Sequence, residues 1–381
     1  MNHKILPYET NKTGYFPADT VSLSILNTYN DQLSFLYGFY NLFAFECYYQ
    51  DGSIIYNVEL DWESPTLCRK EIPRSVLHND KNFSIIDFII SSIDNGYYIY
   101  ITLDVNKLNC YRNINLDFKP HPLIIYGYNQ SKKELHIADY FDGAHYKNGV
   151  VSYDEVNTAN NSVFSRMKIL DPLCGTNDSI LDIELIKYLK NCNLIADTDY
   201  ICHSINLFLD GKWVTGNRNQ YILNRRLPRT AIDNLGKNKY YEAETFNEEY
   251  GINAFWGIVR HIENCISSNK YIFNFRHIHL ICLYYELFIN KILILKQNFC
   301  CCESCKQFDK ILTEANAHRR LLKAAVFLSI KYSKYSYKEQ YESNAKKYLI
   351  DVNNIIKKEI QYIYDVNYIV KNILYEINRK H

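Results

Sequence analysis

The sequence lacks the short motifs that identify nucleotide-binding enzymes, serine hydrolases and many metal enzymes. Its 381 residues include only 13 glycines, and these never take the spacing of a dinucleotide-binding or phosphate-binding loop. A G-x-S-x-G nucleophile elbow and an H-E-x-x-H metal motif are also missing. These absences argue against nucleotide chemistry and zinc-dependent hydrolysis. The sequence therefore predicts neither a cofactor nor a metal.

An excess of charge of one sign is also lacking. The chain carries 43 Lys and Arg against 42 Asp and Glu, a formal net charge of +1. Because nucleic-acid binding depends on a basic surface, we expect no nucleic-acid partner. The balance is uneven along the chain, since residues 306–381 hold 15 basic against 8 acidic residues. Such a basic segment is more often a solvated helical face than a docking site for an acidic protein.

The sequence has no long uninterrupted apolar run. The most apolar stretch, Leu280 to Leu295, is broken by Glu286, Asn290 and Lys291, and it falls short of a membrane span. The first residues carry no apolar core of a secretory signal. We therefore expect no membrane contact, a cytoplasmic location and reduced cysteines.

Apolar and aromatic residues, by contrast, are plentiful. Hydrophobic residues make up 47% of the chain and 35 residues are tyrosine, which excludes a disordered chain. The length predicts two domains, each able to bury a core. Because Asn, Lys, Ile and Tyr recur throughout, any single tyrosine carries little information about function.

Hydrophobic periodicity predicts a mixed α/β domain over residues 1–172 and a mainly helical domain over residues 173–381. Asp171-Pro172 and the polar segment 175–178 mark the boundary. We expect helices over 20–29, 84–93, 180–189, 252–267, 276–296, 308–332, 338–347 and 350–378, strands over 97–103, 123–128, 134–139 and 163–170, and a short hairpin near Asp210-Gly211.

A cluster of cysteines from Cys300 to Cys305 (CCCESC) contains one C-x-x-C pair. Such a pair can bind zinc or form a redox couple, but a structural zinc site needs four ligands. No second C-x-x-C pair exists, and the next histidine, His318, has no partner at zinc-binding spacing. A loop of free thiols is the favoured interpretation, with zinc or redox chemistry as the alternative.

His121 and Asp139 form the most informative pair. His121 begins the predicted strand HPLIIYGY, and Asp139 ends the strand ELHIAD that follows a polar turn. In a tight antiparallel hairpin these two ends lie side by side. A carboxylate there can hold one imidazole nitrogen and leave the other as a general base. Hairpin ends with His and Asp are also common outside catalytic sites.

The same segment resembles the papain-like fold and, within it, the butirosin biosynthesis protein H family. That family includes acyltransferases associated with antibiotic gene clusters. The resemblance rests on His121 at the head of a strand with a Gly-Tyr end, a short turn, and the strand ending at Asp139. A helix ending at Tyr29 and the aromatic stretch 35–45 (FLYGFYNLFAF) agree with it. The match covers residues 1–170 and, more weakly, the helical half.

This resemblance implies an α+β, papain-like N-terminal half that transfers an acyl group. A cysteine at the start of the core helix would attack a thioester on an acyl or peptidyl carrier protein. The acyl group would then pass to a small-molecule or peptide amine, with His121 as base and Asp139 orienting it. The helix start reads FPADTVS, without cysteine. Thr20 is the nearest hydroxyl nucleophile and also a natural N-cap, and Ser22 is a weaker choice.

Three functional hypotheses follow. The first is an acyl or peptidyl transferase of nonribosomal-peptide-type antibiotic biosynthesis, with an unusual nucleophile or with His121 acting directly on the amine. The second is a non-catalytic homologue that binds a carrier protein or its product. The third is a cysteine peptidase or amidase that uses Cys47. Whether the helical half binds the carrier protein or forms a homodimer stays open.

Overall fold

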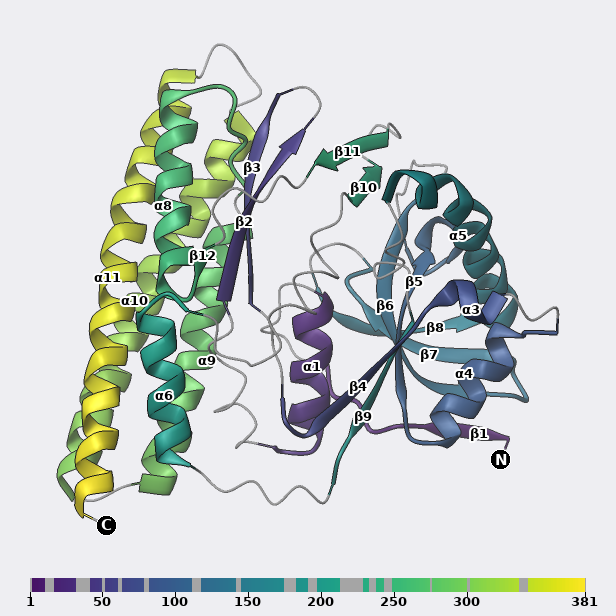
Figure 1. Cartoon of the computed structure of the whole chain (residues 1–381), viewed down its shortest axis with the longest axis horizontal. Helices are drawn as coiled ribbons and strands as arrows, with labels where there is room; N and C mark the ends of the chain where they lie inside the picture. The colour runs from purple at the N-terminus through teal and green to yellow at the C-terminus, as the bar shows by residue number, and fades with distance from the viewer. Residues whose placement is uncertain are drawn as a thin grey trace. The chain divides into compact units, whose positions relative to one another are not determined.

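The computed structural model has a mixed α+β architecture divided into two compact units (Figure 1). The first unit combines Met1–Asp31, Pro65–Cys192 and Asn219–Glu242, and the second combines Gln32–Ser64, Asn193–Arg218 and Ala243–His381. The structure describes residues 2–10, 17–31, 42–49, 52–60, 64–78, 82–111, 118–141, 145–174, 183–190, 197–212, 229–232, 238–242, 249–274, 276–299, 302–335 and 342–380.

An antiparallel sheet forms the centre of the first unit. Its strands follow the order β4-β9-β5-β6-β7-β8, and β1 pairs with β6. The bounds are β1 His3–Ile5, β4 Leu67–Ile72, β5 Tyr98–Asp104, β6 Pro120–Asn129, β7 Glu134–Asp139, β8 Lys147–Ser152 and β9 Ile183–Tyr188. Residues 120–125 of β6 pair with β5, and residues 127–129 pair with β1. The predicted strands over 97–103, 123–128 and 134–139 are confirmed.

Helices cover both faces of this sheet. Figure 1 shows α1 (Pro17–Thr28) on one face and α4 (Ile85–Asp94) and α5 (Tyr153–Cys174) on the other. The predicted helix over 84–93 is confirmed as α4, whose N-cap Ser84 accepts a hydrogen bond from a first-turn backbone N–H. The shorter elements are α3 Arg74–His78, the 3-10 turn η1 Val105–Lys107, and the antiparallel pair β10 Arg229–Ile232 and β11 Asn238–Glu242.

Two elements of the first unit differ from the prediction. Residues 163–170 belong to α5 and not to a strand, because Ser152 and Glu155 exchange hydrogen bonds in a capping box that starts this helix. Residues 183–188 form strand β9 and not a helix. Their alternating sequence, IELIKY, allows β9 to pair with β4 on one side and β5 on the other.

Long helices dominate the second unit. These are α6 Thr198–Leu209, α8 Ile252–Ser267, α9 Arg276–Phe299, α10 Cys302–Tyr335 and α11 Glu342–Lys380. α10 packs against α9 and α11, and α11 also contacts α6 and α8. A small sheet accompanies them, in which β2 (Leu42–Tyr49) pairs with β3 (Ile54–Leu60) and with β12 (Glu249–Tyr250).

The helical predictions in this unit are largely confirmed. Helices over 252–267, 276–296 and 308–332 are present as α8, α9 and α10. Over residues 342–380 one helix, α11, replaces the predicted pair at 338–347 and 350–378, because no glycine or proline interrupts this segment; residues 338–341 lie outside the described residues. The hairpin predicted near Asp210-Gly211 is instead the end of α6, where Gly211 has a φ of 67°.

α9 is the apolar core of the helical bundle. By length and composition, its segment His277–Phe299 could cross a membrane, yet 72% of the most apolar part of that segment is buried inside the fold. The sequence predicts that no apolar segment is long enough to span a membrane, whereas this helix is long enough. Lys291 in this helix is fully buried, and burial lowers its pKa well below the usual lysine value.

The two units do not follow the predicted boundary at residue 172. β9 lies beyond that boundary but pairs within the sheet of the first unit, whereas β2 and β3 lie before it and belong to the second unit. Strand pairing joins segments that are distant in sequence, and turn signals cannot reveal it. The sequence boundary is therefore not where the contacts divide the molecule.

Candidate functional site

His121 and Asp139 meet at one end of β6 and β7. Nε2 of His121 lies 3.0 Å from Oδ2 of Asp139. The Asp139 side chain is fully buried, whereas 31% of the His121 side chain is exposed. When Nε2 donates its proton to the carboxylate, Nδ1 keeps a lone pair and can accept a proton. The predicted meeting of these residues is confirmed, and their catalytic role stays a prediction.

The hairpin that joins β6 and β7 explains why these residues meet. Asn129 pairs with Glu134 at its closed end. The Asn129 side chain accepts a hydrogen bond from the backbone N–H of Lys132, as turn-forming asparagines do. Lys133 completes the turn with a φ of 54°. The turn sets the register at the closed end, and an irregularity in β6 between Ile125 and Gly127 shifts it by one residue toward the end where His121 meets Asp139.

Tyr111 is a third member of this site that sequence reasoning missed. Its phenol donates a hydrogen bond to Oδ2 of Asp139. Its ring stands edge-on to His121, with ring centroids 6.4 Å apart, and edge-on to Phe141 at 5.1 Å. Burial, followed by the charge of Asp139, raises the pKa of Tyr111 well above its usual value. Among 35 tyrosines, nothing in the sequence distinguishes this one.

Cys110, the residue before Tyr111, brings a thiol to the same region. Its side chain is partly buried. Burial, with smaller contributions from Glu155 and Asp139, raises the pKa of Cys110 to about 12. The thiol is therefore protonated at neutral pH, which makes it a poor nucleophile without a base beside it.

The two predicted hydroxyl nucleophiles, Thr20 and Ser22, are fully buried in α1. The Thr20 hydroxyl lies 2.8 Å from the phenol oxygen of Tyr140. The Ser22 hydroxyl accepts a hydrogen bond from the guanidinium of Arg69. Because α1 begins at Pro17, Thr20 lies inside the helix and is not its N-cap. Both hydroxyls contribute to helix packing, which argues against a nucleophilic role.

Strand geometry also separates His121 from α1. Side chains alternate between the two faces of a sheet along each strand, and paired residues share a face. Tyr98 of β5 points to the α1 side, where its phenol contacts Tyr29 just beyond α1. Leu103, five residues further along β5, therefore points to the opposite face, and it pairs with His121. The base and the helix that carries Thr20 lie on different faces.

The remaining predicted thiol sites lie elsewhere in the chain. Cys47 is in β2 of the second unit, whereas His121 is in the first; its side chain lies outside the described residues, as do Cys300 and Cys301. Cys305 lies in the first turn of α10 and is disulfide-bonded, so the prediction of a free-thiol loop is wrong there. Within the described ranges, no group of three or more His, Cys, Asp or Glu side chains could hold a metal ion.

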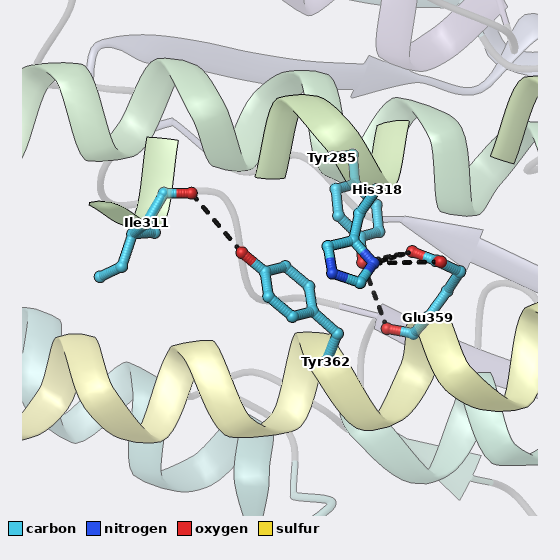
Figure 2. A network of polar contacts seen from close by, with 5 residues as sticks. All are labelled: Tyr285, Ile311, His318, Glu359 and Tyr362. Atoms are coloured by element: carbon cyan, nitrogen blue, oxygen red, sulfur yellow. Dashed lines mark hydrogen bonds and ion pairs between the residues drawn. The ribbon is translucent and has the colours of Figure 1, made fainter. Parts of the chain in front are cut away.

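A second His–carboxylate pair lies in the helical unit (Figure 2). Glu359 of α11 accepts hydrogen bonds from Nδ1 of His318 at 3.0 Å and from the phenol of Tyr285 at 2.9 Å. Tyr362 stacks on His318 with ring centroids 3.7 Å apart, and its phenol lies 3.5 Å from the carbonyl oxygen of Ile311. This cluster connects α9, α10 and α11.

Of the two pairs, the one in the first unit is the better candidate for chemistry. His121 lies at a strand end, where loops and strand termini commonly carry function, whereas His318 lies within a helix under the ring of Tyr362. A scan against protein-family models finds no match, and a search of the curated proteins finds none. The choice therefore rests on the geometry of the residues.

Proposed function

We propose that this chain is an acyl or peptidyl transferase of natural-product biosynthesis with a papain-like N-terminal half. It forms an amide from a carrier-protein-bound thioester and an amine, in the cytoplasm. The observation that carries the proposal is the 3.0 Å contact between His121 Nε2 and buried Asp139, which leaves Nδ1 as a base. The order of a buried helix, a histidine strand and an aspartate strand supports the resemblance to the butirosin biosynthesis protein H family.

In this reaction His121 acts directly on the amine. The amine nitrogen attacks the carbonyl carbon of the thioester, so that a C–N bond forms and the C–S bond breaks. Nδ1 of His121 takes the proton that the amine loses and returns it to the departing thiolate. Asp139 stabilises the imidazolium that exists between these two transfers. The histidine ends the reaction neutral, and no oxidant or reductant is required.

The buried hydroxyls favour this direct route over a covalent acyl-enzyme. A hydroxyl nucleophile needs a base within hydrogen-bonding reach, because it is weak at neutral pH. Thr20 lies on α1, on the other side of the sheet from His121, and its hydroxyl is held by Tyr140. Attack by the amine needs no protein nucleophile and therefore fits the described residues better.

The test replaces His121 by glutamine, whose amide can still donate a hydrogen bond to Asp139 but cannot act as a base. Octanoyl-loaded carrier protein and a panel of small primary amines serve as substrates, and mass spectrometry measures the amide. We expect product formation to fall by roughly 10²- to 10⁴-fold, the usual contribution of a general base. His318→Gln is the matched control and should retain wild-type activity. An unchanged yield in His121→Gln would contradict the proposal.

A second candidate function is binding of a carrier protein without catalysis. The burial of Thr20 and Ser22 and the absence of a cysteine from the start of α1 favour it. Stable binding of the octanoyl-loaded carrier protein by the wild-type chain, with no amide formed from any amine, would support this candidate and overturn the first.

A further inference from the structure

The carboxylate of Asp139 has an unusual set of partners for a fully buried anion. A buried carboxylate is stable in its ionised form only when hydrogen-bond donors replace the water it has lost. Asp139 has two described donors, Nε2 of His121 and the phenol of Tyr111, and both bind Oδ2. Oδ1 has no hydrogen-bond partner among the described residues. Each of the two donors therefore helps to stabilise the negative charge of the Asp139 carboxylate.

We propose that Tyr111 is the positioning residue of this site, which fixes the ionised Asp139 carboxylate against His121 so that Nδ1 stays the proton acceptor. The inference deepens the proposed function, and its catalytic consequence rests on that function. Tyr111 itself does not need to touch the substrate. It acts on the reaction through Asp139.

The packing around Tyr111 holds its phenol in place. The ring stands edge-on to both His121 and Phe141. Phe141 in turn lies over Gly149 of β8, where an added Cβ would come within 2.8 Å of the phenylalanine ring. Gly149 therefore leaves the space that Phe141 occupies behind Tyr111. A phenol held in this way loses little additional freedom when it donates to Asp139.

Loss of the phenol should change the titration of His121 in a defined direction. A hydrogen bond to an anion favours the anionic form, so removing the Tyr111 donor leaves the carboxylate charge less stabilised. The His121–Asp139 pair then binds a proton more tightly as a unit. The midpoint measured for His121 should therefore be higher in a variant that lacks the phenol than in the wild type. The acid limb of the activity profile should move in the same direction.

The experiment compares Tyr111→Phe with Tyr128→Phe. Tyr128 is a matched control, because it is a fully buried tyrosine of the same unit whose phenol donates to a carboxylate, Asp94, at 2.7 Å. NMR of the imidazole carbons follows the titration of His121, assigned by the signal that His121→Gln removes. Circular dichroism checks that both variants remain folded.

The proposal expects the His121 midpoint to rise in Tyr111→Phe and to stay at the wild-type value in Tyr128→Phe. An unchanged midpoint in folded Tyr111→Phe, or an equal shift in both variants, would overturn it. This readout needs no substrate. A shifted midpoint in a chain that makes no amide would therefore refute the transferase while leaving the role of Tyr111 intact. If Tyr111→Phe does not fold, Tyr111→Gln, which offers an amide donor and adds no titrating group, should keep the wild-type midpoint, and its failure to do so would also overturn the proposal.

Discussion

Two buried carboxylates, Asp139 in the first unit and Glu359 in the second, each accept hydrogen bonds from one histidine and one tyrosine. Asp139 is fully buried beneath a histidine that is 31% exposed, and Glu359 is 1% exposed beneath a histidine that is 27% exposed. They differ in the nitrogen that the carboxylate holds. Asp139 binds Nε2 of His121 and leaves Nδ1 available, whereas Glu359 binds Nδ1 of His318.

The surroundings of the two pairs differ more than the pairs themselves. Asp139 receives a phenol from Tyr111, in a loop beside the sheet, whereas Glu359 receives one from Tyr285, on a neighbouring long helix. Tyr362 then covers the His318 ring (Figure 2). The same three chemical groups therefore occur at a strand end, where we propose that they serve a reaction, and inside a bundle, where they connect three helices. The two clusters differ in the elements that support them.

The strongest test of this difference removes the helical carboxylate. Glu359→Ala removes the buried carboxylate to which Tyr285 and His318 both donate, and leaves Tyr285 only the backbone carbonyl oxygen of residue 359 at 3.3 Å. We therefore expect the free energy of unfolding to fall by about 3–5 kcal/mol. Urea unfolding followed by helical circular dichroism measures the loss. Glu286→Ala is the control, because the 2.8 Å contact of Glu286 with Arg319 is partly exposed and should contribute less than about 1 kcal/mol. Equal losses in the two variants would contradict the structural role of Glu359.

A buried histidine that is bonded to a backbone carbonyl, and not to a carboxylate, among the described residues extends the comparison. Nε2 of His261 donates to the carbonyl oxygen of Ile272 at 3.0 Å, and burial lowers the pKa of His261 from 6.5 to about 4. Between these two pH values the unfolded chain binds a proton that the folded chain does not. The free energy of unfolding should therefore decrease as the pH falls from 6.5 to 4, by about 3 kcal/mol in full.

The measurement for His261 is the slope of unfolding free energy against pH. His261→Gln keeps a donor for Ile272 but cannot titrate, so its curve between pH 6.5 and 4 should be flatter than that of the wild type. Urea unfolding at several pH values gives both curves. Parallel curves would show that His261 does not contribute to acid destabilisation.

The smallest expected effect on stability comes from His318→Gln. The glutamine amide can still donate to Glu359, so the loss in unfolding free energy should be about 1 kcal/mol. Amide formation should be unaffected, whereas the proposed function predicts that His121→Gln loses activity at a similarly small cost in stability. Urea unfolding and the product assay on both variants make this comparison. A loss of activity in His318→Gln would mean that the second pair also takes part in the reaction.

The parts of the fold that sequence predicts well are those specified by nearby residues. α4 has its own N-cap at Ser84, and the β6–β7 hairpin has its own turn. β9 is predicted wrongly because its state depends on β4 and β5, which lie about a hundred residues earlier and provide its hydrogen-bond partners. For α5 a local signal does exist, because Ser152 and Glu155 form a capping box at its start. The pattern of residues 163–170, which predicts a strand, is a weaker signal than this cap.

The candidate site shows the same limit. His121 and Asp139 are predictable together, because a single hairpin places them side by side. Tyr111 reaches Asp139 across 28 residues, and His318 reaches Glu359 across 41 residues between two helices. No spacing rule connects residues so far apart, and among 35 tyrosines the sequence does not single out Tyr111. These contacts can be identified only when the packing of the helices and strands is known.

The interleaved order of the two units has a consequence for how the protein can be divided. The chain passes between the units five times. A cut after residue 172 would separate β9 from its neighbours β4 and β5, and would leave β2 and β3 apart from the helices of their own unit. Neither fragment would contain the complete core of one unit. For expression, limited proteolysis and exchange with other proteins, the smallest intact piece is therefore the chain that contains both units.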